Sequence, residues 1–352
     1  PAKSFFKLLL SPNKFSNWSR NGLVVFLGGD QFWSVLLSAR LKYKHLTYAE
    51  WVARWPQWND HIAAMSLSVK HALPKRFQAR CSVVGDLMAD ISEFTTNQEK
   101  LTKGKWIVLM PGSKKAKLSV GVPFFIEVVD HVKKLMPECN FILPVAPTTN
   151  LEEIKNYCTS NNPIARQYNS KIIYTQEANN KNIWKRFITD NGNEINLIED
   201  FPAHNLIAQC DLALTTVGAN TAELGALCVP MIVVLPTQHL SVMQAWDGLI
   251  GLLCKIPGFR NIIGMLIWFW RLRKKGFFAW PNISAGRMIV SERVGYITPK
   301  EIANEANDLL KSKHKLENQK KALKKLRGNP GAVDAMTEEI IHLMNKVNRL
   351  NK

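Results

Sequence analysis

Short apolar runs alternate with helical segments along the middle of this chain, and this alternation limits the fold more than any other feature of the sequence. Strands that alternate with helices form right-handed βαβ units, and such units build a parallel sheet covered by helices. The sequence therefore predicts a doubly wound, Rossmann-like α/β domain. Its expected strands lie at 106–110, 140–145, 171–175, 211–215 and 230–235, with helices at 122–135, 201–209 and 220–227.

The front of the chain shows the same alternation over a shorter length. Residues 21–27 (NGLVVFL) have the pattern of a buried strand, residues 31–40 that of a helix and residues 80–84 that of a further strand. The segment 95–104 is polar, so we place a domain boundary there, and 352 residues suit two domains. We expect a partial N-terminal α/β domain at 1–94, a C-terminal Rossmann-like domain at 105–300 and C-terminal helices at 301–352.

The charge balance limits the partners. The formal net charge is +18 and the pI is about 9.7, and such an excess attracts polyanions. The basic run 311–327 has the pattern of a solvated helix face, and neither zinc-finger spacing nor an arginine-rich arm occurs, so we expect no nucleic-acid partner. The six cysteines form no CxxC pair, which favours free thiols in a reducing, cytoplasmic compartment.

The strand expected at 106–110 ends in a turn with phosphate-binding chemistry. In parallel α/β sheets, ligands bind beyond the carboxyl ends of the strands. Gly112 lets backbone N–H groups approach a phosphate, Ser113 adds a hydroxyl donor and Lys114 adds a cation. The start of the next helix also favours negative charge. A plain strand-to-helix turn is the alternative, because Pro-Gly-Ser is a common turn sequence.

The strand expected at 211–215 ends in a second loop of small residues. Gly218 leaves room for a ligand, and Thr221 can donate to a phosphate. Glu223 falls in the first helical turn, where a carboxylate suits the helix dipole and can accept from a ribose diol. An ordinary N-terminal helix charge is the alternative for Glu223. Two such loops on one sheet favour a nucleotide diphosphate site.

The stretch 247–280 is rich in apolar and aromatic residues and contains a cationic cluster. Lys255, Pro257 and Arg260 interrupt it, whereas a membrane-spanning helix needs about twenty nearly uninterrupted apolar residues. The pattern favours an interfacial anchor on anionic lipid, with a buried helical hairpin as the alternative. The residues of the expected anchor are Trp268, Trp270, Arg271, Arg273 and Lys274.

Several motifs carry a family resemblance. The PGSK turn at 111–114 resembles the PGSR turn of lipid-A-disaccharide synthases, and TVGANTAE at 216–223 resembles their SGTATLE loop. WPNISAGR at 280–287 is similar to their LPNLLAGR, and SVVGDLMAD at 82–90 is similar to their FVGHPLAD. The motifs occur in the same order, and the resemblance covers the chain from residue 21 to the C-terminus.

The resemblance implies a GT-B-like fold, in which two Rossmann-like, doubly wound domains face a cleft and the C-terminal one binds the UDP part of a sugar donor. By position, Ser113, Lys114 and Thr221 would contact the diphosphate. Glu223 would hold the ribose.

Three further residues gain an expected role from the same resemblance. Asn282 and Arg287 would approach the donor, and Asp30 would take the proton of the acceptor hydroxyl. A loop carboxylate that caps the next helix is the alternative for Asp30. The family's GExSGD segment has no counterpart here, so we expect an incomplete N-terminal domain. Asp86 stands where the family has histidine, and Lys114 where it has arginine.

The resemblance also implies an activity. A UDP-sugar-dependent, inverting hexosyltransferase would transfer an acylated glucosamine to a lipid-linked sugar acceptor, peripherally on the cytoplasmic side of the inner membrane. Such enzymes need no metal, and the sequence contains no metal-ligand cluster, so we expect neither a metal nor a cofactor. The family's C-terminal helices can exchange between protomers, which allows a homodimer. Another UDP-sugar-dependent glycolipid glycosyltransferase and a non-catalytic, membrane-bound nucleotide-sugar-binding protein are the alternatives.

Overall fold

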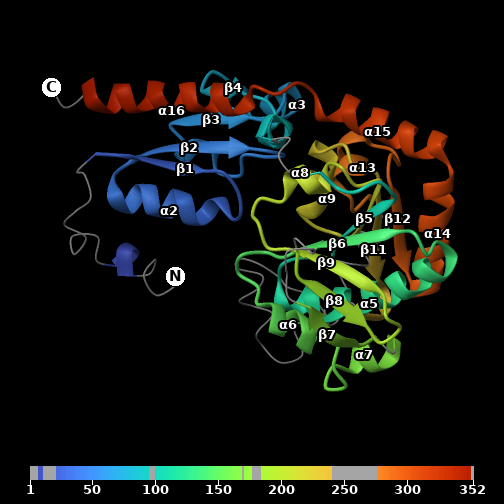
Figure 1. The fold of residues 1–352 in the computed structure, drawn as a ribbon. Coiled ribbons are helices and arrows are strands. Elements are labelled where there is room, and N and C mark those ends of the chain that lie inside the picture. The colour runs from blue at the N-terminus through green and yellow to red at the C-terminus, as the bar shows by residue number, and fades with distance from the viewer. Residues whose placement is uncertain are drawn as a thin grey trace. The chain divides into compact units, whose positions relative to one another are not determined.

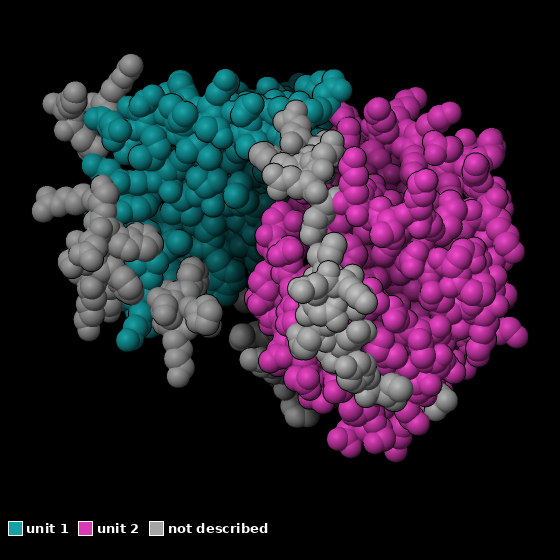
Figure 2. Space-filling model, viewed as in Figure 1, with its two compact units in different colours: residues 1–90, 329–352 teal, residues 91–328 magenta. Residues whose placement is uncertain are grey.

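The chain forms two compact units, which Figure 2 draws in different colours. Unit 1 comprises Pro1–Asp90 and Asn329–Lys352, and unit 2 comprises Ile91–Gly328. Each unit is built on its own sheet of wholly or mainly parallel strands, which confirms the expected α/β fold class. The computed structural model describes residues 7–10, 21–94, 100–168, 170–176, 184–239 and 276–349.

Unit 1 is a four-stranded parallel sheet with helices α2 and α16 on opposite faces (Figure 1). The strands lie in chain order, β1-β2-β3-β4, which is the order within one half of a doubly wound sheet. Leu46 and Tyr48 pack against Met336 and Leu343 of α16. The elements are β1 (Leu23–Phe26), α2 (Gln31–Leu41), β2 (Lys44–Ala49), η2 (Pro56–Trp58), β3 (His61–Ala64), α3 (Leu67–Ala72), α4 (Lys75–Gln78), β4 (Cys81–Val83), η3 (Leu87–Phe94) and α16 (Ala332–Arg349).

A buried carboxylate joins the last helix to unit 1. Asp90 is 2% exposed and accepts from the backbone N–H groups of Gly331 (2.7 Å), Ala332 (3.4 Å) and Val333 (2.6 Å), the first groups of α16. These N–H groups have no partner within a helix, and a carboxylate suits the positive end of the helix dipole. The segment expected as 301–352 is therefore divided between the units, because α16 is capped and buried in unit 1.

Unit 2 contains an eight-stranded sheet of order β12-β11-β10-β5-β6-β9-β8-β7, parallel from β12 to β9 and antiparallel at β8 and β7. Helices α5 and α14 contribute to the core on one face, and α8 and α9 to the core on the other. The strands are β5 (Trp106–Met110), β6 (Asn140–Pro144), β7 (Ile172–Gln176), β8 (Arg186–Thr189), β9 (Glu194–Ile198), β10 (Leu212–Thr216), β11 (Met231–Pro236) and β12 (Ser291–Gly295). The helices are α5 (Lys115–Leu135), α6 (Leu151–Asn156), α7 (Pro163–Tyr168), α8 (His204–Ile207), α9 (Asn220–Ala226), η4 (Thr237–His239), α13 (Trp280–Ala285), α14 (Pro299–Lys311) and α15 (Lys313–Arg327).

Helix α5 begins at Lys115, seven residues before the start that the sequence suggested. Pro123 lies inside the helix and cannot donate to the carbonyl of Ser119 four residues earlier. That carbonyl instead accepts from Nδ2 of Asn162 at 2.8 Å. Gly121 lets the helix approach the loop after β5, because a Cβ at this position would lie 2.9 Å from Cβ of Pro111.

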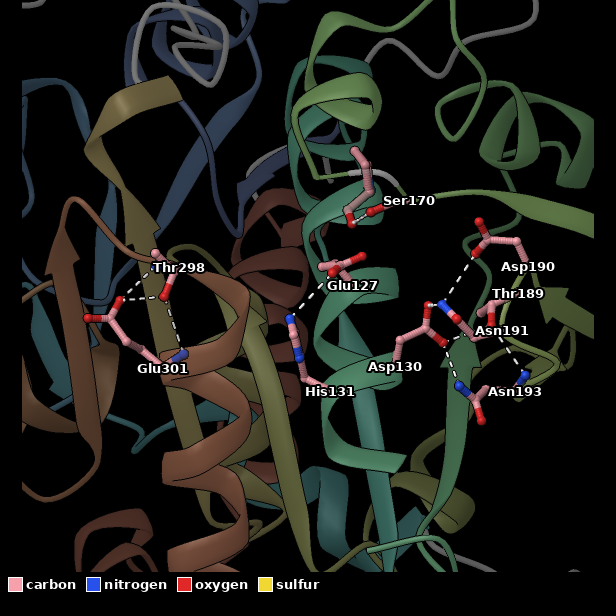
Figure 3. Close-up of polar contacts among 11 residues, drawn as sticks. Glu127, Asp130, His131, Ser170, Thr189, Asp190, Asn191, Asn193, Thr298 and Glu301 are labelled. Carbon is pink, nitrogen blue, oxygen red and sulfur yellow. Dashed lines mark hydrogen bonds and ion pairs between the residues drawn. The ribbon is translucent and has the colours of Figure 1, made fainter. Parts of the chain in front are cut away.

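A second buried carboxylate holds the turn between β8 and β9 against α5 (Figure 3). Asp130 of α5 is 2% exposed. It accepts from Oγ1 of Thr189 at 2.8 Å, Nδ2 of Asn191 at 2.8 Å and Nδ2 of Asn193 at 2.6 Å. Three donors around one desolvated carboxylate replace the water that it loses on burial.

Replacing Asp130 with alanine is expected to lower the free energy of unfolding of unit 2 by about 3 kcal/mol, because three buried donors lose a charged acceptor. Urea denaturation followed by the tryptophan fluorescence of the whole chain measures the change. Asp190→Ala is the matched control, since Asp190 is an exposed carboxylate in the same turn and should change stability by less than about 0.5 kcal/mol. Equal effects of the two substitutions would contradict an anchoring role for Asp130.

The predicted membrane anchor cannot be compared with the structure. Trp268, Trp270, Arg271, Arg273 and Lys274 all lie outside the described residues. In the part of the chain that is described, no helix combines the length and the apolar character needed to cross a bilayer.

Candidate nucleotide-sugar site

The two predicted loops lie at the point where the strand order of unit 2 reverses. Strand β5 has β6 on one side and β10 on the other, and the pairing of β10 with β5 runs from Leu212 and Ile107 to Thr215 and Met110. Both strands are parallel, so the loops after Met110 and Thr216 leave the same edge of the sheet. This is the switch point at which doubly wound sheets bind ligands.

Side chains tie the two loops together at this edge. Oγ1 of Thr216 donates to the carbonyl of Pro111 at 3.1 Å, and Oγ1 of Thr215 donates to the carbonyl of Met110 at 3.1 Å. Nδ2 of Asn220 donates to the same Met110 carbonyl at 3.2 Å. These bonds join the two loops, residues 111–114 and 217–220, which we call the ledge.

Both predicted glycines have backbone angles that favour glycine, with φ of +106° at Gly112 and +151° at Gly218. The space beside them is occupied by a residue that the motif analysis missed. A Cβ at Gly112 would lie 3.1 Å from Cβ and Cδ of Lys117, and a Cβ at Gly218 would lie 2.9 Å from its Nζ. The room that the sequence assigned to a ligand therefore accommodates the side chain of Lys117.

Lys117 is the third residue of α5, and its Nζ donates to the carbonyl of Val217 at 2.7 Å. It thus spans from the helix after β5 to the loop after β10. In the sequence, Lys117 lies three residues beyond Lys114. This spacing indicates a residue of the site only if the helix starts at Lys115, because Lys117 then lies in the first helical turn. Ser113 and Lys114 are exposed at the front of the same helix, where phosphate oxygens could reach them.

Thr221 is 1% exposed, and its hydroxyl forms hydrogen bonds within the protein. Its hydroxyl donates to the carbonyl of Gly218 at 2.8 Å and accepts from the N–H of Trp280 at 3.0 Å. A hydroxyl has a single proton to donate. Thr221 therefore cannot donate to a phosphate while it keeps its bond to Gly218, and its expected diphosphate contact stays a prediction that requires this bond to break.

Asn282 is fully buried and also belongs to the scaffold. Its Oδ1 accepts from the N–H groups of Ile289 (2.6 Å) and Val290 (2.9 Å). Its Nδ2 donates to the carbonyl of Val290 (2.9 Å) and to Oε1 of Glu292 (2.7 Å). A side-chain amide has two acceptor and two donor positions, and all four are filled. The expected donor contact of Asn282 stays a prediction, and it would require some of these bonds to break.

Two expected donor residues keep side chains that a ligand could reach. Glu223 in the first turn of α9 is half-buried and pairs through Oε1 with Nε2 of His204 at 3.1 Å. Arg287, just after α13, is exposed. The motif that contains both Asn282 and Arg287 thus supplies one scaffold residue and one accessible cation.

A buried polar group follows β11, the strand next to β10. Nε2 of His239 lies 2.7 Å from the hydroxyl of Tyr168, which also accepts from Nε2 of Gln238 at 3.2 Å. Burial lowers the pKa of His239, so the imidazole is neutral at pH 7. Sequence analysis missed this group because its members come from separate elements.

Asp30 belongs to unit 1, where it is the N-cap residue of α2. Its Oδ1 accepts from the N–H of Phe32 at 3.1 Å, and the side chain is partly exposed. The capping alternative therefore describes its contact, while the exposed part of the carboxylate leaves a role as base open to test. Among the described residues, no three His, Cys, Asp or Glu side chains gather closely enough to hold a metal ion.

No family model matches the sequence, but individual relatives do. The lipid-A-disaccharide synthase of Anaeromyxobacter sp. strain K is 25% identical over 242 residues, which cover 68% of this chain and 49% of that protein. The lipid-A-disaccharide synthase of Sulfurihydrogenibium sp. is 23% identical over 274 residues, covering 75% of this chain and 59% of the relative. The chain is thus similar in sequence to lipid-A-disaccharide synthases, at low identity. It matches about half the length of the Anaeromyxobacter protein.

Solved structures show that this chain has the GT-B fold. The UDP-GlcNAc 2-epimerase of Neisseria meningitidis, solved with UDP-GlcNAc, has a TM-score of 0.55 at 12% identity, covering 96% of this chain and 80% of that one. A putative UDP-N-acetylglucosamine 2-epimerase from Listeria monocytogenes also has a TM-score of 0.55 at 12% identity, covering 97% of this chain and 79% of that one. The expected glycosyltransferase-like architecture is confirmed at the level of the fold.

Proposed function

We propose that this chain is a glycosyltransferase that transfers an acylated glucosamine from a UDP-sugar to a lipid-linked sugar acceptor, with inversion. The observation that carries the proposal is the ledge of unit 2, where two glycine loops and the start of α5 meet at the switch point of a doubly wound sheet. The sequence relation to lipid-A-disaccharide synthases supports the reaction, and fold neighbours solved with UDP or UDP-GlcNAc support the nucleotide.

The donor would bind with its diphosphate at the ledge. The N–H groups at Gly112 and Gly218, the hydroxyl of Ser113 and the cation of Lys114 would face the phosphate oxygens. Glu223 would accept from the ribose hydroxyls. Arg287 would reach the donor from the segment after α13. Electrostatic stabilisation of departing UDP by these groups would lower the barrier, since charge develops there as the sugar leaves.

The acceptor hydroxyl would attack the anomeric carbon from the side opposite UDP, which inverts that centre. Asp30 would take the proton of the hydroxyl as its oxygen forms the new bond. Both sugars must be held in line, which supplies much of the rate enhancement. The proposed reaction uses no metal and no cofactor besides the UDP-sugar substrate.

A lipid-linked acceptor lies in a membrane, so the proposed transfer reaction would occur at a membrane surface. We propose a peripheral position on the cytoplasmic face of the inner membrane, in contact with anionic lipid, and the net charge of +18 supports that attraction. A homodimer is part of the same proposal.

A non-catalytic, membrane-bound nucleotide-sugar-binding protein is the second candidate function. The hydrogen bond of Asp30 to the N–H of Phe32 favours it, because a capping role alone accounts for that carboxylate. In this case UDP binds at the ledge without turnover. Transfer to a different glycolipid acceptor would instead appear as turnover with another sugar or lipid.

Thermal unfolding with UDP and a panel of UDP-sugars tests the donor site. A ligand at 100 times its Kd stabilises the folded state by about 2.7 kcal/mol, which corresponds to an increase in Tm of about 5–10 °C for a unit of this size. Glu223→Ala is expected to remove about half to most of this increase, because a lost hydrogen bond to a charged group lowers affinity roughly tenfold to a hundredfold.

His204→Ala is the matched control for this experiment. It removes the partner of Glu223 and keeps the carboxylate, so the increase in Tm should persist. If His204→Ala abolishes the increase as fully as Glu223→Ala, the pair supports the loop and does not bind ribose. No increase with any uridine nucleotide would contradict the glycosyltransferase proposal.

A further inference from the structure

We infer that Lys117 binds the diphosphate of the nucleotide sugar and that its ammonium moves from the Val217 carbonyl to a phosphate oxygen when the donor binds. The inference rests on the proposed function, because it concerns the same ledge. It names a residue outside the PGSK and TVGANTAE motifs. Its basis is the path of the Lys117 side chain between the two loops.

The geometry of the glycines shows that the ledge is shaped around this side chain. A Cβ at Gly112 would lie 3.1 Å from the stem of Lys117 and one at Gly218 would lie 2.9 Å from its Nζ, so either Cβ would require the lysine side chain to shift. The loops thus admit one long cationic side chain along the line where the two strand ends meet. Nζ of Lys117 donates to the carbonyl of Val217 and lies beside Gly218, in the loop after β10.

Three lysines lie around the start of α5. The first turn contains no acidic residue, while Lys114 is the N-cap residue and Lys115 and Lys117 follow it. Cations at the positive end of a helix dipole destabilise the helix. Lys115 is compensated by Glu153, whose Oε1 lies 3.0 Å from its Nζ. A bound diphosphate would bring negative charge to this positive end of the helix, where the dipole favours it.

The hydrogen bond from Nζ of Lys117 to the Val217 carbonyl could be exchanged for one to a phosphate oxygen. A neutral carbonyl is a weaker acceptor for an ammonium than a charged phosphate oxygen. Lysine carries its charge on a flexible stem, so a short movement of Nζ can replace one acceptor with the other. Release of the Val217 carbonyl would then loosen the tie from α5 to the loop after β10 only when the donor has bound.

Isothermal titration with UDP, uridine and inorganic pyrophosphate tests the inference. Lys117→Met keeps the length of the stem and removes the charge. We expect it to weaken UDP and pyrophosphate binding by about 10- to 100-fold and to leave uridine binding within about twofold. Lys117→Arg, which restores a cation, should recover most of the affinity for pyrophosphate. Lys115→Met is the control and should change none of the three affinities by more than about twofold.

The outcomes separate this inference from the proposed function. Unchanged UDP and pyrophosphate affinity in Lys117→Met overturns the role of Lys117 and leaves the donor site standing. Equal losses for UDP and uridine also overturn it, because they indicate a structural role in the loop. If pyrophosphate binds in a Lys117-dependent way and UDP binds no better than pyrophosphate, the anion site stands and the nucleotide-sugar proposal fails. No binding of either anion by the native chain contradicts both.

Discussion

Replacing Asp30 with asparagine is expected to lower kcat for sugar transfer by about 100- to 10,000-fold while leaving the stability of unit 1 nearly unchanged. A general base contributes a rate factor of this size, and an amide cannot take the acceptor proton. Asparagine caps helices about as well as aspartate, so the bond to the Phe32 N–H has a replacement. The substitution therefore separates the two roles that the structure allows for this carboxylate.

Initial rates of UDP release with a UDP-sugar and a lipid-linked acceptor measure the change, and thermal unfolding measures stability. Asp334→Asn is the matched control, since Asp334 is an exposed carboxylate in the first turn of α16, also in unit 1. It should change neither quantity. Asp30→Ala should lose both activity and about 1 kcal/mol of stability. A native rate for Asp30→Asn would leave Asp30 as a helix cap and assign the acceptor proton to another group, whereas no turnover by the native chain would favour the non-catalytic candidate.

The strand ends of unit 2 were predictable from the sequence because they depend on local patterns and one topological rule. The apolar run WIVLM coincides with β5, and DLALT overlaps β10. Parallel strands joined by helices must present their carboxyl ends at one edge. The two loops were therefore expected at one site before any distance was known, and the pairing of β5 with β10 confirms it.

Strand β2 could not be predicted in the same way, because it buries polar residues. Its sequence, KHLTYA, contains His45 and Thr47, which are 1% and 0% exposed. Both contact Oδ1 of Asn59, at 2.5 Å from Nδ1 of His45 and 3.1 Å from Oγ1 of Thr47. A pattern of apolar residues does not reveal a polar pair whose partner lies twelve or more residues away.

Helix α5 illustrates a different limit of sequence analysis. The expected start at residue 122 lies between Gly121 and Pro123, two residue types that ordinarily mark the start or end of a helix. In the structure Asn162 satisfies the carbonyl that Pro123 leaves without a donor, and Gly121 meets Pro111. The early start of α5 in turn positions Lys117. The position of Lys117 in the candidate site thus depends on tertiary contacts of α5, and a motif match alone could not find it.

Replacing Asn282 with alanine is expected to lower the free energy of unfolding of unit 2 by about 4 kcal/mol and to leave no specific defect in UDP binding. The substitution removes four hydrogen bonds and leaves backbone groups of Ile289 and Val290 buried without their partner. Each unsatisfied buried group costs about 1–3 kcal/mol, and values above about 4 are rare for one substitution. Glu292 would also lose its contact with Nδ2, although it keeps the N–H groups of Phe278 and Ala279.

Arg287→Ala in the same motif is expected to behave in the opposite way. Arg287 is exposed, so its loss should change stability by less than about 0.5 kcal/mol, while the loss of a cation that contacts the donor should weaken UDP binding about tenfold. Urea denaturation and isothermal titration of both variants give the comparison, with titration done at a temperature where Asn282→Ala remains folded. A folded Asn282→Ala protein that has lost UDP binding, beside a native Arg287→Ala, would reverse the assignment. Such a result would mean that the PNISAGR segment contacts the donor through its buried amide, and that the four bonds of Asn282 rearrange on binding.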